Sequence, residues 1–133
     1  MFNRPKYGNR RVKIDNITFD STSEAERFQL LKILLSHGNI SQLRTHPRYW
    51  IQVRGAKAFQ YEADFEYVDH NGKLVVEDIK GFITPMSKLK MKCFQLEYPD
   101  IKFVMLKFYK KAATFEQIEL KTKRKKGHGQ KVQ

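Results

Sequence analysis

Apolar residues at helical spacing indicate a first helix early in the chain. It is predicted to start at Ser21 or Ser23 and to end at about Ser36. Gly38 and Asn39 follow and stop it. Its predicted apolar stripe comprises Ala25, Phe28, Leu31, Leu34 and Leu35.

A second helix is predicted in the later half of the chain. Thr84 is a good N-cap and Pro85 suits the first helical position, so the helix is expected to start there. It runs to about Tyr98, because Pro99 ends it. Its predicted core stripe comprises Met86, Leu89, Cys93 and Leu96. Lys88, Lys92 and Gln95 share a different face.

Strict alternation of apolar and polar residues between the helices indicates a β-hairpin. Residues 59–67 form its first strand and residues 73–80 its second, joined by a turn at His70-Asn71-Gly72. A two-residue loop would place Asp64 and Asp78 on opposite faces, whereas a three-residue loop ending in Gly72 places them side by side. Like charges repel across a ladder, so the second register is predicted with a cation between the two aspartates.

The remaining segments carry weaker patterns. Residues 12–20 are predicted to be extended, and residues 40–53 to form a loop and then a strand that residues 54–57 interrupt. Residues 103–106 are apolar throughout, which suits a strand buried on both faces. The pattern of residues 112–120 is ambiguous.

Charge is distributed unevenly along the chain. The 133 residues carry a formal net charge of +12, yet residues 1–13 and 121–133 contain 11 of the 26 Lys and Arg residues and no acid. We therefore expect a basic arm at 1–13, a globular domain at 14–120 and a disordered basic tail at 121–133. The arm and the tail are expected to attract a polyanion such as DNA, or else only to aid solubility. The expected phosphate contacts at the ends are Arg10, Arg11, Lys123, Arg124, Lys125 and Lys126. Lys88 and Lys92 are expected to contact phosphate or simply to lie on a solvated helix face.

Several classes of protein do not fit the sequence. No apolar stretch approaches the ~20 residues that cross a bilayer, and the basic start lacks the apolar core of a signal peptide, so no membrane association is expected. Cys93 is the single cysteine, which excludes an internal disulfide and fits a reducing, cytoplasmic compartment. Four scattered histidines make a zinc site improbable, and the absence of a Walker-type loop implies no nucleotide cofactor.

Glu24 lies at the centre of the first helix's apolar stripe, where a carboxylate is costly unless its charge is compensated. Two interpretations remain open. Ser21 and Glu24 have the spacing of a capping box, in which the glutamate bonds back to the helix start. Alternatively, Glu24 points inward and contributes to a metal site.

The sequence Asp78-Ile79-Lys80 carries the candidate chemistry. Residues two apart on a strand share a face, so Asp78 and Lys80 point into the same space, and Asp64 joins them in the predicted register. Two carboxylates, the Ile79 carbonyl and waters suit Mg²⁺. Lys80 beside that ion would position a water or stabilise the charge that develops on a phosphodiester.

In this order, the motifs resemble those of the PD-(D/E)XK nuclease superfamily. The matching segments are Phe19-Asp20-Ser21 with Glu24, Tyr61-Glu62-Ala63-Asp64-Phe65, and Val76-Glu77-Asp78-Ile79-Lys80-Gly81 with Thr84, Lys88 and Lys92. They are similar to those of small phage-encoded nucleases laid out like endonuclease I and other Holliday-junction-resolving enzymes. The resemblance covers residues 6 to about 108. Ala63 stands where the superfamily usually has proline, Asp78 where glutamate is frequent, and His46 where a glutamine is expected.

The resemblance implies an α/β fold with a restriction-endonuclease-like core, in which helices flank a central mixed sheet. It also implies Mg²⁺-dependent hydrolysis of DNA, with Mn²⁺ able to substitute, and a homodimer that cuts both strands of a branched junction in a bacterial host's cytoplasm. Asp64 and Asp78 would be metal ligands, Lys80 the catalytic lysine and Glu24 the helix-borne acid. Two alternatives remain: a restriction- or transposase-type nuclease that cuts linear duplex, and a non-catalytic DNA-binding protein.

Overall fold

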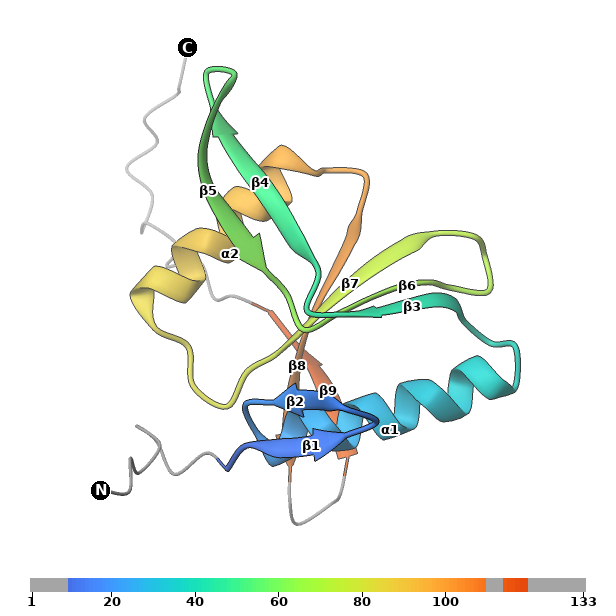
Figure 1. Ribbon diagram of the computed structural model, residues 1–133. Coiled ribbons are helices and arrows are strands. Elements are labelled where there is room, and N and C mark those ends of the chain that lie inside the picture. The colour runs from blue at the N-terminus through green and yellow to red at the C-terminus, as the bar shows by residue number, and fades with distance from the viewer. Residues whose placement is uncertain (1–9, 110–113, 120–133) are drawn as a thin grey trace, which may run out of the picture.

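The computed structural model describes residues 10–109 and 114–119, which form two helices and nine strands (Figure 1). The elements are β1 (Val12–Ile14), β2 (Ile17–Phe19), α1 (Thr22–Ser36), β3 (Ser41–Thr45), β4 (Arg48–Val53), β5 (Ala56–Glu62), β6 (Phe65–Val68), β7 (Leu74–Ile79), α2 (Pro85–Glu97), β8 (Lys102–Tyr109) and β9 (Thr114–Ile118). Among the described residues, no helix combines the length and apolar character needed to span a membrane.

A mixed five-stranded sheet organises the fold. Its strand order is β3-β6-β7-β8-β9, and only the β7–β8 pair is parallel, because α2 connects those two strands. β7 lies at the centre, and Val75 to Ile79 are all buried. The hairpins β1–β2 and β4–β5 form two further small sheets. The expectation of an α/β domain with a central mixed sheet and flanking helices is therefore confirmed.

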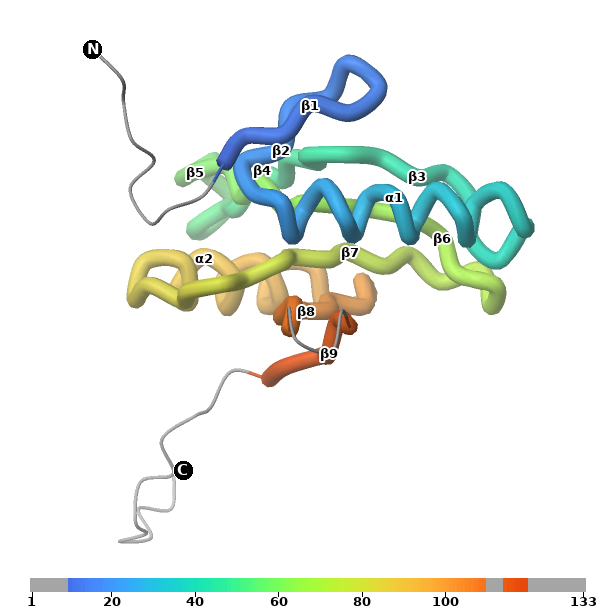
Figure 2. The backbone as a smooth tube through the Cα atoms, turned by 90° about the horizontal axis from the view of Figure 1, so that it is seen from below, coloured from blue at the N-terminus to red at the C-terminus, as the bar shows by residue number. Residues whose placement is uncertain are grey.

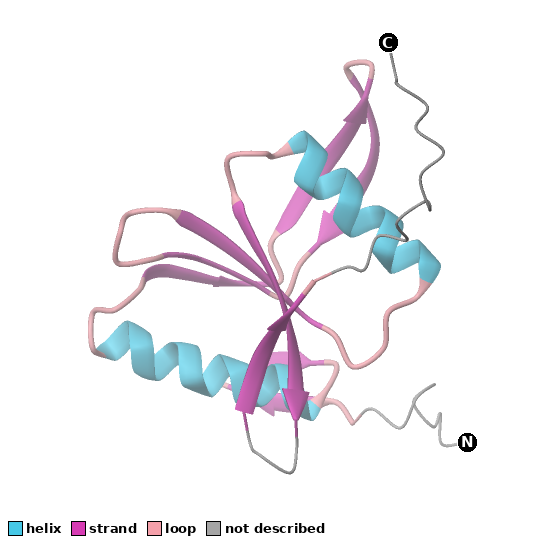
Figure 3. Ribbon diagram, turned by 180° about the vertical axis from the view of Figure 1, so that it is seen from behind, coloured by secondary structure: helices cyan, strands magenta, loops and turns pink. Residues whose placement is uncertain are grey.

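Two apolar clusters fill the two sides of this sheet. Figure 2 shows α1 running along β7, where its buried residues Phe28 and Leu31 pack with Phe65 and Val75. On the other side, Met91 and Phe94 of α2 pack with Tyr61 and Val76, and α2 lies beside the β4–β5 hairpin (Figure 3). Successive residues of β7 thus point alternately toward α1 and toward α2.

Both helices have the starts that were predicted. The Ser21 side chain accepts a hydrogen bond from the Glu24 N–H and caps α1. Thr84 and Ser87 form a reciprocal capping box at the start of α2, with Pro85 in the first turn. Gly38, at φ +75°, follows α1 in the left-handed region that glycine adopts without strain.

The β6–β7 hairpin has the predicted register. Phe65 pairs with Glu77 and Val68 with Leu74, and the loop ends in Gly72 at φ +78°. The ladder stops one pair short of Asp64 and Asp78, and the Asp64 N–H donates to the Glu77 carbonyl at 3.1 Å. The two aspartates therefore lie next to each other at the end of the hairpin.

Three details of the predicted elements are wrong. The single strand expected over residues 59–67 is broken at Ala63 and Asp64, because β5 pairs with β4 and β6 joins the main sheet. The loop expected after residue 40 contains β3, which pairs with β6. Leu35 of the α1 stripe is 39% exposed.

The predicted core stripe of α2 is also wrong. Met86, Leu89 and Leu96 are 60%, 55% and 72% exposed, and Cys93 is half-buried. Met91 and Phe94, on the opposite side of the helix, are fully buried instead. Aromatic contacts decide this orientation, since Phe94 packs against Tyr49 and Tyr61 with ring centroids 4.9 and 5.0 Å apart.

The predicted basic ends lie mostly outside the described residues. Residues 121–133 are not described, and neither are residues 1–9. β1 begins at Val12, inside the segment predicted to be the N-terminal arm, and pairs with β2.

Candidate active site

A cavity of about 460 Å³ opens at the end of β7, where the β4–β5 hairpin diverges from the main sheet. Four of its lining residues are the predicted site residues Glu24, Asp64, Asp78 and Lys80, which come from three segments of the chain: the start of α1, the break between β5 and β6, and the end of β7. The cavity is also lined by Arg11, Thr18, Asp20, His46, Glu62 and Ile79.

Asp78 and Lys80 extend from the end of the central strand. Asp78 is 3% exposed, and its Oδ1 lies 3.2 Å from the Lys80 Nζ. The buried hydroxyl of Tyr61 donates a hydrogen bond to the second oxygen of Asp78. Burial raises the pKa of Tyr61, and the negative charge of Asp78 raises it further, so this hydroxyl remains a donor. Asp78 is therefore held in place from two sides.

Asp64 occupies the break between β5 and β6. Its Oδ2 accepts a hydrogen bond of 2.6 Å from the Ile79 N–H, which ties it to the end of β7. Burial raises its pKa well above the usual range, and the neighbouring carboxylates of Asp78 and Glu24 raise it further. Three neighbouring carboxylates, those of Asp64, Asp78 and Glu24, favour the binding of either a proton or a cation.

Glu24 reaches the same place from the first turn of α1. Burial raises the pKa of its carboxyl to about 7, with further contributions from the charges of Asp20 and Asp78. Ser21 accepts from the backbone N–H of Glu24, as a capping box requires, while the Glu24 carboxylate lies close to Asp64 and His46. The Ser21 side chain thus caps the helix as a capping box requires, and the Glu24 carboxylate also lies at the candidate metal site.

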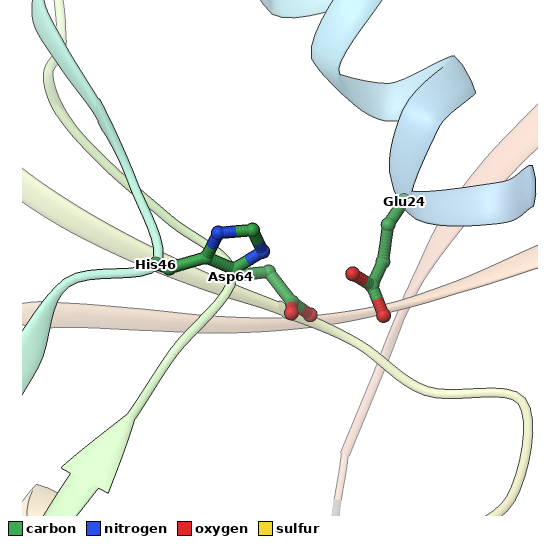
Figure 4. A group of neighbouring side chains, drawn as sticks. All are labelled: Glu24, His46 and Asp64. Atoms are coloured by element: carbon green, nitrogen blue, oxygen red, sulfur yellow. The ribbon is translucent and has the colours of Figure 1, made fainter. Parts of the chain in front are cut away.

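The sequence showed His46 only as a departure from an expected glutamine and assigned it no role, yet it lies at the site. Ligand atoms of Glu24, His46 and Asp64 all lie within 4.8 Å of one another, and Figure 4 shows the three side chains converging. His46 separates β3 from β4 at φ +50°, and its N–H donates to the Asp64 carbonyl at 2.9 Å. Its ring packs on Phe19 at a centroid distance of 5.6 Å. No spacing rule connects His46 to Asp64, because their proximity arises from long-range strand pairing.

The side chains present fit a divalent cation. Two cationic side chains, Arg11 and Lys80, line the cavity with five carboxylates, those of Asp20, Glu24, Glu62, Asp64 and Asp78. Lys80 is paired with Asp78. A divalent ion would offset the repulsion that raises the pKa values of Glu24 and Asp64. Glu24 and Asp64, with the imidazole of His46, are grouped closely enough to share one ion.

A family comparison bears on the whole of this site. A family model described as "Protein of unknown function (DUF1064)" matches residues 4–117. The chain belongs to the DUF1064 family. Neither the curated proteins nor the solved structures contain a match to this DUF1064 protein. The matched range includes all the cavity residues and both helices of the DUF1064 domain.

The predicted DNA contacts of this DUF1064 protein are not gathered at the cavity. Lys88 and Lys92 are exposed on α2 and do not line the cavity, and Arg10 is exposed near the start of the described residues. Arg11 does line it and approaches Asp20 at 3.9 Å, with both side chains 80% exposed. Lys123, Arg124, Lys125 and Lys126 lie outside the described residues.

Acidity should stabilise the metal-free DUF1064 protein through Glu24. A carboxyl whose pKa is raised on folding contributes stability below its ordinary pKa and loses that contribution as the pH rises through about 7. The melting temperature should therefore fall between about pH 5 and about pH 8, and Glu24→Gln should flatten that dependence. Glu26→Gln, at an exposed position of the same helix, is the control. Parallel pH profiles for all three proteins would contradict the prediction.

Proposed function

We propose that this protein is a Mg²⁺-dependent endonuclease that hydrolyses phosphodiester bonds in DNA, on a core of the restriction-endonuclease type. The observation that carries the proposal is the convergence of Asp64, Asp78 and Lys80 in one cavity at the end of the central strand. Two carboxylates and a lysine in that arrangement hold a cation and a phosphate side by side. The resemblance to PD-(D/E)XK nucleases supports the same assignment.

The metal ligands in this proposal are Asp64 and Asp78, with the Ile79 carbonyl and Glu24 as further oxygen donors. A bound Mg²⁺ would lower the pKa of a coordinated water and offset charge on the phosphate. Tyr61 and the Ile79 N–H orient the two aspartates through hydrogen bonds. Carboxylate and carbonyl oxygens suit Mn²⁺ as well as Mg²⁺, so the same ligands would accept Mn²⁺ as a substitute.

Lys80 acts on the phosphate and the attacking water in this scheme. Its side chain is 23% exposed, so the ammonium faces the cavity while remaining paired with Asp78. From there it can orient the water and donate hydrogen bonds to the oxygens that gain charge during displacement. Glu24, at the start of α1, would face the same ion as a further oxygen donor.

The proposed substrate is branched DNA, such as a Holliday junction, in the cytoplasm of a bacterial host. This part of the proposal rests on the resemblance to junction-resolving phage enzymes, which also suggests that two copies act on the two strands. The basic ends, including residues 121–133, would add affinity without reading sequence, because phosphate contacts position DNA rather than specify it.

A cleavage assay with matched substrates tests the proposal. A labelled four-way junction, a linear duplex and a single strand of the same sequence are incubated with Mg²⁺, Mn²⁺ or EDTA. Metal-dependent cleavage of the junction, with the linear duplex largely spared, is expected. Equal cleavage of linear duplex would favour a restriction- or transposase-type nuclease. Binding without cleavage under any metal would favour a non-catalytic DNA-binding protein, and cleavage in EDTA would contradict the proposed chemistry.

A further inference from the structure

Helix α2 has two apolar faces. One is buried, and the other is largely exposed except at Cys93, which is half-buried and packs against the edge of the buried cluster. Met91 and Phe94 are fully buried beneath the helix. On the opposite side lies a row that we call the outer stripe, formed by Met86, Leu89, Cys93 and Leu96. Leu96, Met86 and Leu89 are 72%, 60% and 55% exposed, and Phe82, just before the helix, is 66% exposed. Exposed apolar side chains gathered in this way mark an interaction surface.

The spacing of the outer stripe indicates what covers it. Its residues follow one another at intervals of three, four and three, which is the a and d pattern of a helix that pairs with another helix. The tail at residues 121–133 does not match the stripe, since it contains six Lys and Arg residues and Val132 as its single large apolar residue. A helix with an apolar stripe of the same spacing is needed to cover it, and α2 of a second copy of this chain has such a stripe.

We propose that the outer stripe is the interface between two copies of this chain, whose α2 helices pack antiparallel about a two-fold axis. In that register Met86 faces Leu96 of the second copy, and Leu89 faces Cys93 of the second copy. A two-fold axis repeats both contacts, so the surface is self-complementary. Each layer contains a large side chain, whereas a parallel pair would place two small cysteines opposite each other and leave a gap.

Charges at the edge of the stripe agree with this arrangement. Lys90 and Glu97 flank the same side of the stripe, and antiparallel packing brings Lys90 of each copy toward Glu97 of the other. Antiparallel packing also sets the N-terminus of each helix beside the C-terminus of its partner, which the helix dipoles favour.

The pairing has a consequence for the candidate active site. Met86 and Lys90 also line a pocket beside Lys80, so each cavity would adjoin one end of the interface. Since α2 has 13 residues, the two sites would lie about 20 Å apart along its axis. The inference stands on the outer stripe and not on nuclease activity, so its test needs no DNA.

Sedimentation equilibrium of the full chain tests the association. We expect a dimer, and Leu89→Asp should weaken self-association roughly 100-fold, because two buried leucines are lost from each dimer. Lys92→Asp, which lies beside the stripe rather than in it, is the matched control. Lys90→Glu should weaken the dimer, and adding Glu97→Lys should restore it. A wild-type protein that is monomeric at about 100 µM would overturn the proposal.

A cysteine pair tests the register independently of affinity. Leu89→Cys should form a covalent dimer under mild oxidation, because Cys93 of the second copy lies opposite, and Leu89→Cys with Cys93→Ser should not. Circular dichroism of each variant should show that the fold is retained, because Leu89 is 55% exposed and Cys93 only half-buried. A bridge between two native Cys93 residues, or between two introduced cysteines at position 89, would overturn the antiparallel register.

Discussion

Lys80→Ala is expected to reduce the rate of DNA cleavage about 10²–10³-fold, the cost of removing one donor to a developing oxyanion. Its ammonium lies 3.2 Å from Asp78 Oδ1 and faces the cavity, so the substitution removes a charge at the reacting phosphate. The fold should persist, because Asp78 keeps the Tyr61 hydroxyl as a donor and, unlike a carboxylate in the core, lines an open cavity that water can enter. The measurement is the single-turnover rate on a four-way junction at saturating enzyme.

A second lysine on the same sheet provides the control. Lys102 is exposed at the start of β8 and pairs with Val75, at the opposite end of β7 from Lys80. Lys102→Ala should therefore cleave at the wild-type rate. Asp64→Asn and Asp78→Asn should lose cleavage to a similar or greater degree than Lys80→Ala, and should also lose Mn²⁺ binding, which Lys80→Ala should retain. A Lys80→Ala variant as active as Lys102→Ala would remove Lys80 from the proposed mechanism.

The part of the site that the sequence predicts is the part set by local chemistry. Asp78 and Lys80 share a face because strand residues alternate, and the three-residue loop ending in Gly72 sets Asp64 beside Asp78. The helix starts follow from Ser21 and from Thr84 with Pro85, whose side chains act within a few residues of themselves. These features depend only on residues close together in the sequence, so they can be predicted without the tertiary structure.

The features that the sequence does not predict depend on distant partners. His46 joins the site because its backbone N–H bonds to Asp64, which lies in the break between β5 and β6, far along the chain. The break at Ala63 arises because β5 follows β4 while β6 joins β7. The orientation of α2 could not be read from its own pattern, since the helix has two apolar rows. The face that carries Phe94 is the buried one, because burying an aromatic side chain removes more apolar surface from water than burying Leu89 would.

Arg27→Ala is expected to destabilise the fold by about 3–5 kcal/mol, the usual cost of breaking one side of a buried ion pair. The Glu77 side chain lies on the opposite face of β7 from the Asp78 side chain, and Glu77 is fully buried. Arg27 of α1 donates to both of its oxygens, with Nε–Oε1 and Nη2–Oε2 distances of 2.7 and 2.6 Å, and the Tyr67 hydroxyl donates as well. Without the guanidinium, a carboxylate remains in the core with one donor. Urea denaturation measures the loss.

Two further variants separate the buried charge from the lost contacts. Arg27→Met with Glu77→Gln removes both charges at similar volume and should recover most of the stability, because the cost lies in leaving Glu77 unpaired. Arg48→Ala breaks an exposed pair of 4.0 Å with Glu62, and should cost less than about 1 kcal/mol. A loss for Arg27→Ala no larger than that for Arg48→Ala would contradict the assignment. Because Arg27 lies one turn beyond Glu24 on α1, its ion pair with β7 also holds the Glu24 carboxylate at the cavity.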